Sequence, residues 1–139
     1  MPKTEPDCIF CKIVAGEISA HKVYEDGFTY AFLDANPVNP GHTLLVPKKH
    51  VRNILDMDEE TITKLGVATL KVARAVKKGT KADGLVISSN NEPAAGQVVF
   101  HAHTHIIPRH NNDGLHHWPQ GKYEEGAAEQ IRDKITSII

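Results

Sequence analysis

Histidines are the residues of this sequence whose spacing most clearly indicates chemistry. Nine occur in 139 residues, and three of them, His101, His103 and His105, alternate with other residues. If this stretch is a β-strand, alternate side chains point to one face, so the three imidazoles would lie together. Near neutral pH each imidazole can act as a proton donor, a nucleophile or a metal ligand. The stretch therefore predicts a reactive face on one strand.

Three interpretations of this face are open. It could be a solvated polar surface, a zinc site, or a centre for nucleophilic attack on phosphorus, in which one imidazole attacks and its neighbours orient it and stabilise charge. The preceding residues 90–97 read NNEPAAGQ and are rich in amides and backbone N–H donors, which suit phosphate oxygens. They favour phosphorus chemistry.

The elements that position these residues are short. Apolar runs bounded by turn residues predict strands over residues 23–24, 28–33, 42–46, 84–89 and 98–107. Helices are predicted over 9–14, ending at Gly16, over 124–138, and from a capping box of Asp56 and Glu59 to the basic turn before Gly79. The fold class is therefore α+β, an antiparallel sheet of about five strands with one long helix and short flanking helices, all on one side.

Length and charge limit the class of protein. One domain is expected over residues 1–139, with a core of about 8–109 and a tail over 110–139. A formal net charge of −1 argues against a nucleic-acid or anionic-membrane partner, and no apolar run is long enough to span a bilayer. The polar start of the chain lacks the apolar core of a secretion signal, which predicts a cytoplasmic location.

Four separated motifs resemble those of one family. Residues 95–109 (AGQVVFHAHTHIIPR) resemble the signature of the histidine triad (HIT) nucleotide-binding proteins. The same family is matched, in the same order, by CIFCKI at 8–13, FLD at 32–34 and GHTLLVPKKH at 41–50. The resemblance covers the chain from about Cys8 to Arg109.

The resemblance implies a role for each motif residue. His103 would attack the α-phosphorus and form a nucleotidyl-histidine, which water then cleaves. His105 would contact the phosphate or the leaving group, and the backbone beside His101 would fix the tautomer of His103. His42 would face the phosphate from a neighbouring strand. Gln97 and Asn90 would lie near the scissile bond.

Two further positions affect nucleotide binding. By the same resemblance, Asp34 would hold the ribose hydroxyls, although an Asx turn in the following loop is an alternative explanation for an aspartate there. Val98 stands where the family often has serine or threonine, so it offers only its backbone N–H to the phosphate. This departure puts efficient proton delivery to the leaving group in doubt, but not the nucleophile.

A zinc site is also implied. Cys8 and Cys11 have the spacing of half a zinc site, and family members with this pair often add two histidines, which here are His50 and His101. The alternative is two reduced thiols without a metal. A structural zinc would make His101 a ligand and exclude it as an acid or base. No catalytic metal is expected.

The predicted function is that of a homodimeric nucleotide hydrolase or transferase. The resemblance implies purine nucleoside monophosphates (AMP or GMP conjugates) joined to a leaving group through P–N or P–O–P bonds, with the nucleoside phosphoramidases as the nearer branch. Alternatives are a dinucleoside polyphosphate hydrolase, a nucleotide-binding regulator with weak catalysis, and a metallohydrolase that binds its metal through His101, His103 and His105.

Overall fold

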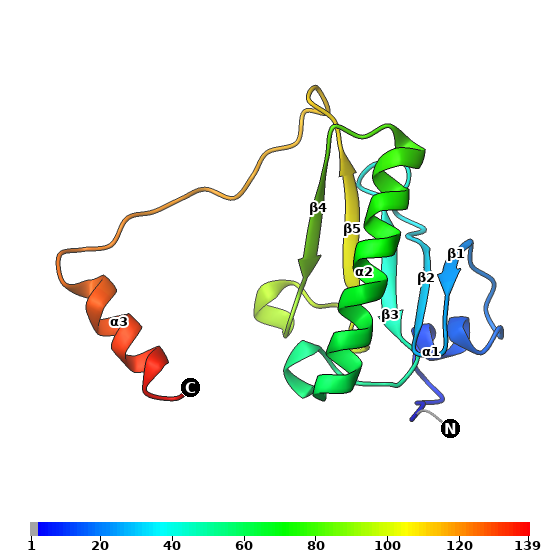
Figure 1. The fold of residues 1–139 in the computed structure, drawn as a ribbon, viewed down its shortest axis with the longest axis horizontal. Coiled ribbons are helices and arrows are strands. Elements are labelled where there is room, and N and C mark those ends of the chain that lie inside the picture. Colours follow the sequence, from blue (N-terminus) through cyan, green and yellow to red (C-terminus); the bar gives the residue numbers. More distant parts are fainter. Residues whose placement is uncertain (1–2) are drawn as a thin grey trace.

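The computed structural model describes residues 3–139, which form one five-stranded antiparallel sheet in the order β1-β2-β3-β5-β4 (Figure 1). The strands are β1 (Lys22–Glu25), β2 (Thr29–Leu33), β3 (Thr43–Pro47), β4 (Gly84–Ser89) and β5 (Thr104–Arg109). The helices are α1 (Ile9–Val14), α2 (Glu59–Thr80) and α3 (Ala127–Thr136), with short 3-10 turns at Ile54–Asp56 and Pro93–Ala95. The predicted α+β class is confirmed.

The long helix α2 covers one face of the sheet. Its apolar side chains recur at helical spacing and are buried against Ala31, Leu45 and Ile106 of β2, β3 and β5. The stripe of Leu65, Val72 and Val76 therefore packs within the protomer's own core.

The short helix α1 lies on the opposite face, whereas we expected all helices on one side. Phe10 and Ile13 of α1 pack against Phe32, Leu44 and Val46 of the sheet. The N-terminal CIFCKI motif is thereby brought to the face that also carries His105, because His105 is the cross-strand partner of Leu44.

The ends of α2 differ from the prediction. Asp58, and not Asp56, is the N-cap, because its carboxylate accepts from the backbone N–H of Thr61 at 2.7 Å. At the other end the helix passes Gly79 and stops at Lys81, which adopts a left-handed conformation with φ 54°. The capping box of Asp56 and Glu59 and the stop at Gly79 were therefore wrong.

Strand β5 begins at Thr104, not at Val98. The N–H of Ala102 bonds to the carbonyl of Val51 at 2.8 Å, which holds the preceding segment in a loop outside the sheet. The strand also continues through Pro108, which pairs with Leu85 of β4 but lies beyond the residues paired with β3. A proline is tolerated there because no β3 carbonyl needs its missing N–H.

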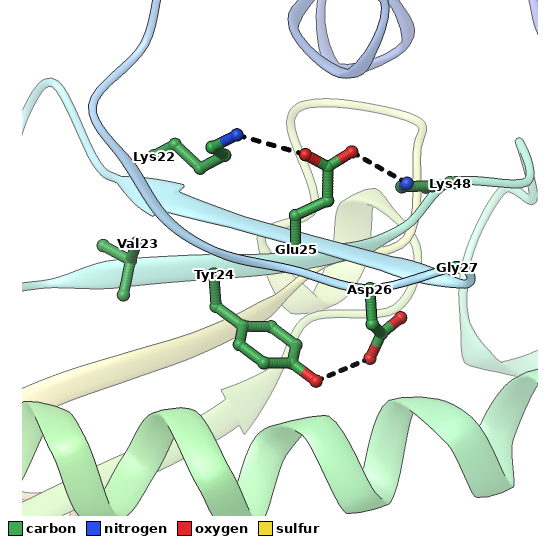
Figure 2. A pocket seen from close by; sticks show the side chains of 7 residues that line it. All are labelled: Lys22, Val23, Tyr24, Glu25, Asp26, Gly27 and Lys48. Carbon is green, nitrogen blue, oxygen red and sulfur yellow. Dashed lines mark hydrogen bonds and ion pairs between the residues drawn. The ribbon is translucent and has the colours of Figure 1, made fainter.

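The first hairpin is fixed by local polar contacts (Figure 2). Its turn contains Asp26, which accepts from the N–H groups of Phe28 and Thr29 and from the hydroxyl of Tyr24, each at 2.8 Å. Glu25 bridges Lys22 at 3.2 Å and Lys48 at 2.8 Å. The pair with Lys48 ties the hairpin to the segment that follows β3 and leads to His50.

After β5 the chain leaves the body of the molecule. Figure 1 shows an extended segment that runs away past the β4 edge of the sheet and ends in the separate helix α3. The predicted helix over 124–138 is confirmed in a shorter form, Ala127–Thr136, and the irregular tail before it is also confirmed. Over residues 3–139, no helix is both long and apolar enough to cross a membrane.

Candidate functional site

Four histidines gather on the α1 face of the sheet. His105 lies in β5, His42 directly precedes β3, and His101 and His103 lie in the loop that enters β5. The ring centroid of His105 is 5.0 Å from that of His103 and 5.2 Å from that of His42. Phe10 of α1 packs edge-on against the rings of His101 and His103. The triad is thus brought together as predicted, although only His105 is in a regular strand.

The orientation of His103 leaves one ring nitrogen free. Its Nδ1 lies 2.7 Å from the carbonyl oxygen of His101, so Nδ1–H donates and Nε2 keeps its lone pair. Burial lowers the pKa of His103, against the opposing effect of this hydrogen bond, and so favours the neutral ring. A neutral imidazole with a fixed tautomer and a free Nε2 can act as a nucleophile.

A chain of hydrogen bonds fixes the tautomers of His42 and His105. The backbone N–H of Val38 donates to Nδ1 of His42 at 3.1 Å, so the proton of this neutral ring is on Nε2. That Nε2–H donates to Nδ1 of His105 at 3.0 Å, which leaves the proton of His105 on Nε2. Burial, with the neighbouring His103 and His42, lowers the pKa of His105 to about 4. His105 therefore presents a neutral N–H donor.

Asp34 stands beside His42 at the end of β2. One carboxylate oxygen accepts from the N–H of Asn36 at 2.8 Å, which is the Asx turn that we considered as an alternative. The other oxygen lies 3.6 Å from Nε2 of His42. The same loop needs a glycine at Gly41, where φ is +98° and a Cβ atom would collide with the side chain of Thr80.

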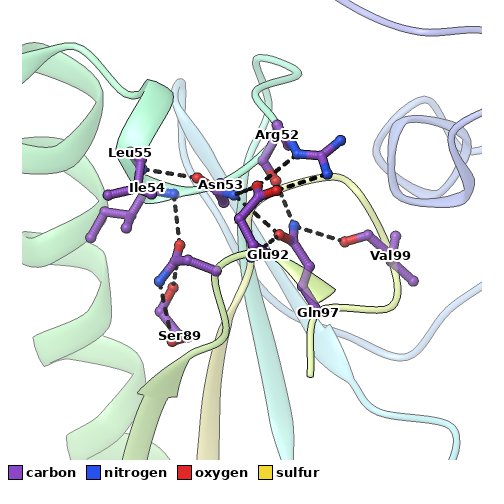
Figure 3. A network of polar contacts seen from close by, with 9 residues as sticks. Arg52, Asn53, Ile54, Leu55, Ser89, Glu92, Gln97 and Val99 are labelled. Atoms are coloured by element: carbon purple, nitrogen blue, oxygen red, sulfur yellow. Dashed lines mark hydrogen bonds and ion pairs between the residues drawn. The ribbon is translucent and has the colours of Figure 1, made fainter. Parts of the chain in front are cut away.

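Gln97 lies behind the histidine loop. Its side chain is buried, and Figure 3 shows both amide atoms in hydrogen bonds. Nε2 donates to the carbonyls of Arg52 and Val99 at 2.6 and 3.1 Å, and Oε1 accepts from the N–H of Glu92 and from Asn53 at 2.9 and 3.2 Å. These bonds occupy the groups with which we expected Gln97 to contact the scissile bond.

An ion pair, which no sequence pattern predicted, completes this network. Arg52 donates to Glu92 through two nitrogens, at 2.7 and 3.0 Å, and its guanidinium lies over the ring of Phe100. Buried Asn53 donates to the same carboxylate. Glu92 has φ 76°, a conformation that L-residues rarely adopt, and these contacts hold it there. The segment 92–100 is therefore held by residues about 40 positions earlier in the chain.

Val98 and Asn90 are the two remaining residues that we expected near the nucleotide. The side chain of Val98 is 83% exposed on the loop between Gln97 and the triad. The amide nitrogen of Asn90 donates to the carbonyl of Ala95 at 2.6 Å and so closes the 3-10 turn in front of Gln97.

Cys8, Cys11, His50 and His101 form a second cluster. Their four ligand atoms all lie within 4.8 Å of one another. Nδ1 of His101 is 3.3 Å from Sγ of Cys8, 3.5 Å from Sγ of Cys11 and 3.2 Å from Nδ1 of His50. Ligands of a tetrahedral zinc ion are about 3.3–3.8 Å apart when its bonds are about 2.0–2.3 Å long.

The protonation of this cluster also suits a cation. Nε2 of His101 is 2.8 Å from the carbonyl of Pro47, so its N–H donates there and Nδ1 presents a lone pair. Burial lowers the pKa of His101 to about 4 and that of His50 below its usual value. Among residues 3–139, the only other group of this kind is Asp34, His42 and His105, so neither group unites the three triad histidines as metal ligands.

Comparison with known proteins agrees with this geometry. The pattern of the HIT domain matches residues 15–112. Protein hit of Bacillus subtilis is 47% identical over 110 residues, which are 78% of this chain and 76% of that protein. Adenylylsulfatase HINT3 of Arabidopsis thaliana is 39% identical over 109 residues, 78% of this chain but 55% of that longer protein.

Solved structures share the fold. SMU.412c from Streptococcus mutans superposes with a TM-score of 0.93 at 45% identity, over 99% of this chain and 88% of that one. A HIT family member from Bacillus subtilis gives 0.90 at 39%, over 96% and 97%. A Zn-bound histidine triad family protein from Mycobacterium smegmatis gives 0.75 at 35%, over 95% of both chains. This chain belongs to the HIT family.

Proposed function

We propose that this protein hydrolyses nucleoside phosphoramidates, or related conjugates of a nucleoside monophosphate, through a nucleotidyl intermediate on His103. The observation that carries the proposal is the hydrogen bond from Nδ1–H of His103 to the carbonyl of His101, which leaves Nε2 as the free nitrogen. The family includes nucleotide-binding proteins, and one named relative is an adenylylsulfatase. The adenylylsulfatase activity of that relative supports an adenylyl conjugate as the substrate of this protein.

The reaction proceeds in two displacements. Nε2 of His103 gives its lone pair to the α-phosphorus, and the bond from phosphorus to the leaving nitrogen or oxygen breaks. The leaving group keeps that electron pair and takes a proton from water, since Val98 has no hydroxyl to supply one. Water then attacks phosphorus and loses a proton to solvent, and the bond from phosphorus to Nε2 breaks. Nε2 keeps the electron pair of that bond, and the nucleoside monophosphate is released.

The neighbouring groups stabilise the charge that develops. While His103 is bonded to phosphorus its ring is cationic, and the carbonyl of His101 accepts from its Nδ1–H throughout. We assign to Nε2–H of His105 a hydrogen bond to a phosphate oxygen. His42 holds the ring of His105 in place, because Nε2–H of His42 donates to Nδ1 of His105. We assign to Asp34 the ribose hydroxyls, and to Gln97 the support of the loop in place of contact with substrate.

The remaining parts of the proposal concern metal and assembly. Cys8, Cys11, His50 and His101 would hold a structural zinc ion that links the N-terminal segment and α1 to the sheet. The zinc ion would cross-link the N-terminal segment to the sheet and would not bind the substrate. We expect purine conjugates as substrates, a homodimer as the active unit and a cytoplasmic location.

The test is turnover of an adenosine phosphoramidate, adenylyl sulfate and a diadenosine polyphosphate by wild type and His103→Ala. We expect wild type to cleave the phosphoramidate fastest, His103→Ala to be inactive, and rapid acid quench of wild type to trap an acid-labile adenylyl-protein. Full activity of His103→Ala would refute the covalent mechanism. Faster cleavage of the diadenosine substrate would keep the mechanism but assign the protein to the dinucleoside polyphosphate hydrolases.

A further inference from the structure

The carboxylate of Asp113 is firmly held at a point outside the histidine site. Its side chain is 7% exposed and lies in the turn that follows β5. Arg109 pairs with it through two nitrogens, at 2.7 and 3.1 Å, and the backbone N–H groups of His110 and Leu115 each donate to it at 3.0 Å. These four bonds are local and close the turn. A fifth comes from Asn39, 74 positions earlier in the chain, whose amide nitrogen is 3.2 Å from Oδ2 of Asp113.

Asn39 anchors the loop between β2 and β3. Its Nδ2 also donates to the carbonyl of Pro108 in β5 at 2.9 Å, so both amide hydrogens are used. In the part of the chain that the structure describes, residues 35–41 make hydrogen bonds beyond residues 34–43 only through this side chain. The side chain of Asn39 is therefore the hydrogen-bonded link from this loop to β5 and to the turn of Asp113.

The backbone at Asn39 holds His42. The carbonyl of Asn39 accepts from the N–H of His42 at 3.0 Å, and the N–H of Val38 donates to Nδ1 of the same histidine at 3.1 Å. Pro37 and Pro40 flank this pair of residues. Each proline has a fixed φ, and Pro40 also restricts the backbone of Asn39, so the segment has few ways to adjust on its own. A shift of the Asn39 side chain is therefore passed to both groups that hold His42.

The bond from Val38 decides where the protons of His42 and His105 lie. With this bond, Nδ1 of His42 accepts, its Nε2–H donates to Nδ1 of His105 at 3.0 Å, and Nε2 of His105 carries a proton. Without it, Nδ1 of His42 can hold the proton instead, and Nε2 of His42 then accepts from Nδ1–H of His105. The neutral ring of His105 would then present a lone pair at Nε2, where the proposed reaction needs an N–H toward a phosphate oxygen.

We propose that Asn39 and Asp113 are positioning residues for the proposed reaction. They hold the backbone of residues 38–39, which keeps the proton on Nε2 of both His42 and His105. This inference rests on the proposed function, because it is there that Nε2–H of His105 has a phosphate oxygen to contact. A purely local role for Asp113 accounts for its four bonds within the turn but not for the bond from Asn39.

NMR of the full-length protein without substrate reads the tautomers directly. Wild type and Asn39→Ala are labelled with ¹⁵N-histidine and compared above neutral pH by two-bond ¹H–¹⁵N correlation, in which protonated and bare ring nitrogens differ in shift. In wild type we expect Nε2–H at His42 and His105. In Asn39→Ala we expect a mixture of both tautomers at these two rings, and an unchanged Nδ1–H at His103. Unchanged tautomers of His42 and His105 would overturn the proposal.

Asp26→Ala is the matched control. Asp26 is another turn carboxylate, and its bonds to two backbone N–H groups and a tyrosine hydroxyl lie in the first hairpin. Asp26→Ala should lower Tm but leave the tautomers and kcat as in wild type, which separates positioning from a general loss of stability. A tautomer change of equal size in Asp26→Ala would overturn the proposal.

Turnover tests the consequence for the reaction. Asn39→Ala should lower kcat for an adenosine phosphoramidate by roughly 10–100-fold, with an equal fall in kcat/KM, because the misplaced proton removes a contact made in the transition state. A kcat equal to that of wild type would overturn the proposal. A wild type without turnover would refute the proposed function instead, and the tautomers would still decide whether Asn39 holds His42 and His105.

A double variant tests the link between the two positioning residues. If Asp113 acts through Asn39, Asn39→Ala with Asp113→Ala should be no slower than Asn39→Ala alone. Effects that multiply would show that Asp113 acts by another route and would overturn its part in the proposal. Asn39→Ala leaves the turn of Asp113 intact, so it decides the role of Asn39 even if Asp113→Ala does not fold.

Discussion

Replacement of Gln97 by alanine separates a structural from a catalytic role for this buried amide. The side chain makes four hydrogen bonds, two as donor to Arg52 and Val99 carbonyls and two as acceptor from Glu92 and Asn53. Each such bond is worth about 1 kcal/mol, and buried partners left unpaired add to the loss. Gln97→Ala should therefore lower the free energy of unfolding by about 3–5 kcal/mol. In a domain of this size that corresponds to a fall in Tm of roughly 10–17 °C.

The assay combines calorimetry with turnover measured well below Tm. If Gln97 were a hydrogen-bond donor to the transition state, Gln97→Ala would reduce kcat by about 10²–10³. If Gln97 supports the loop, the main effect of Gln97→Ala should be a lower Tm. Asn90→Ala is the control, because it removes one hydrogen bond from the adjacent, more exposed turn. A Tm within about 2 °C of wild type, together with a loss of turnover on that scale, would refute the structural role and restore the catalytic one.

Three further predictions follow from the two histidine clusters. Cys11→Ser should abolish zinc binding, measured by atomic absorption. A chelator should lower the Tm of wild type but not that of Cys11→Ser. Unchanged turnover of Cys11→Ser at low temperature would show that the metal is structural and not catalytic. The folded pKa of His105 is about 4, below the usual 6.5, so the unfolded state binds the proton first and stability should fall as pH drops from about 6.5 to 4. His105→Asn should show a shallower fall in urea titrations, and an identical slope would contradict the assignment. Asp34→Asn should raise KM for a ribonucleotide conjugate by roughly tenfold but leave KM for the 2′,3′-dideoxy analogue unchanged; equal effects on both would mean that Asp34 acts only through its turn.

The sequence predicted local elements well where local chemistry decides them. Residues 84–89 and 9–14 have the predicted bounds. The apolar run of the strand, and the glycine that follows the helix, are signals that lie within a few positions of these elements. The N-cap of α2 was misplaced by two residues, since Asp56 and Asp58 are both plausible caps, and Asp56 belongs instead to the 3-10 turn that precedes the helix. Such choices depend on the tertiary structure.

The sequence predicted the residues of the two histidine clusters but not the hydrogen-bond network that holds the loop before β5. Spacing and resemblance named His103 as the proposed nucleophile, and they named Cys8, Cys11, His50 and His101, whose potential ligand atoms the fold brings within 4.8 Å of one another. The network of Arg52, Asn53 and Glu92 was missed because its bonds span about 40 residues and leave no local pattern. The loop before β5 was read as strand for the same reason, since its distant partner is Val51.

His101 serves two centres with different parts of itself. Its ring belongs to the cluster of Cys8, Cys11 and His50, whereas its backbone carbonyl orients His103. Any amino acid provides that carbonyl, so the side chain at this position is free to change in evolution without removing the acceptor. A lineage could thus replace the two cysteines and this imidazole together by an apolar N-terminal anchor and still keep His103 in the same orientation.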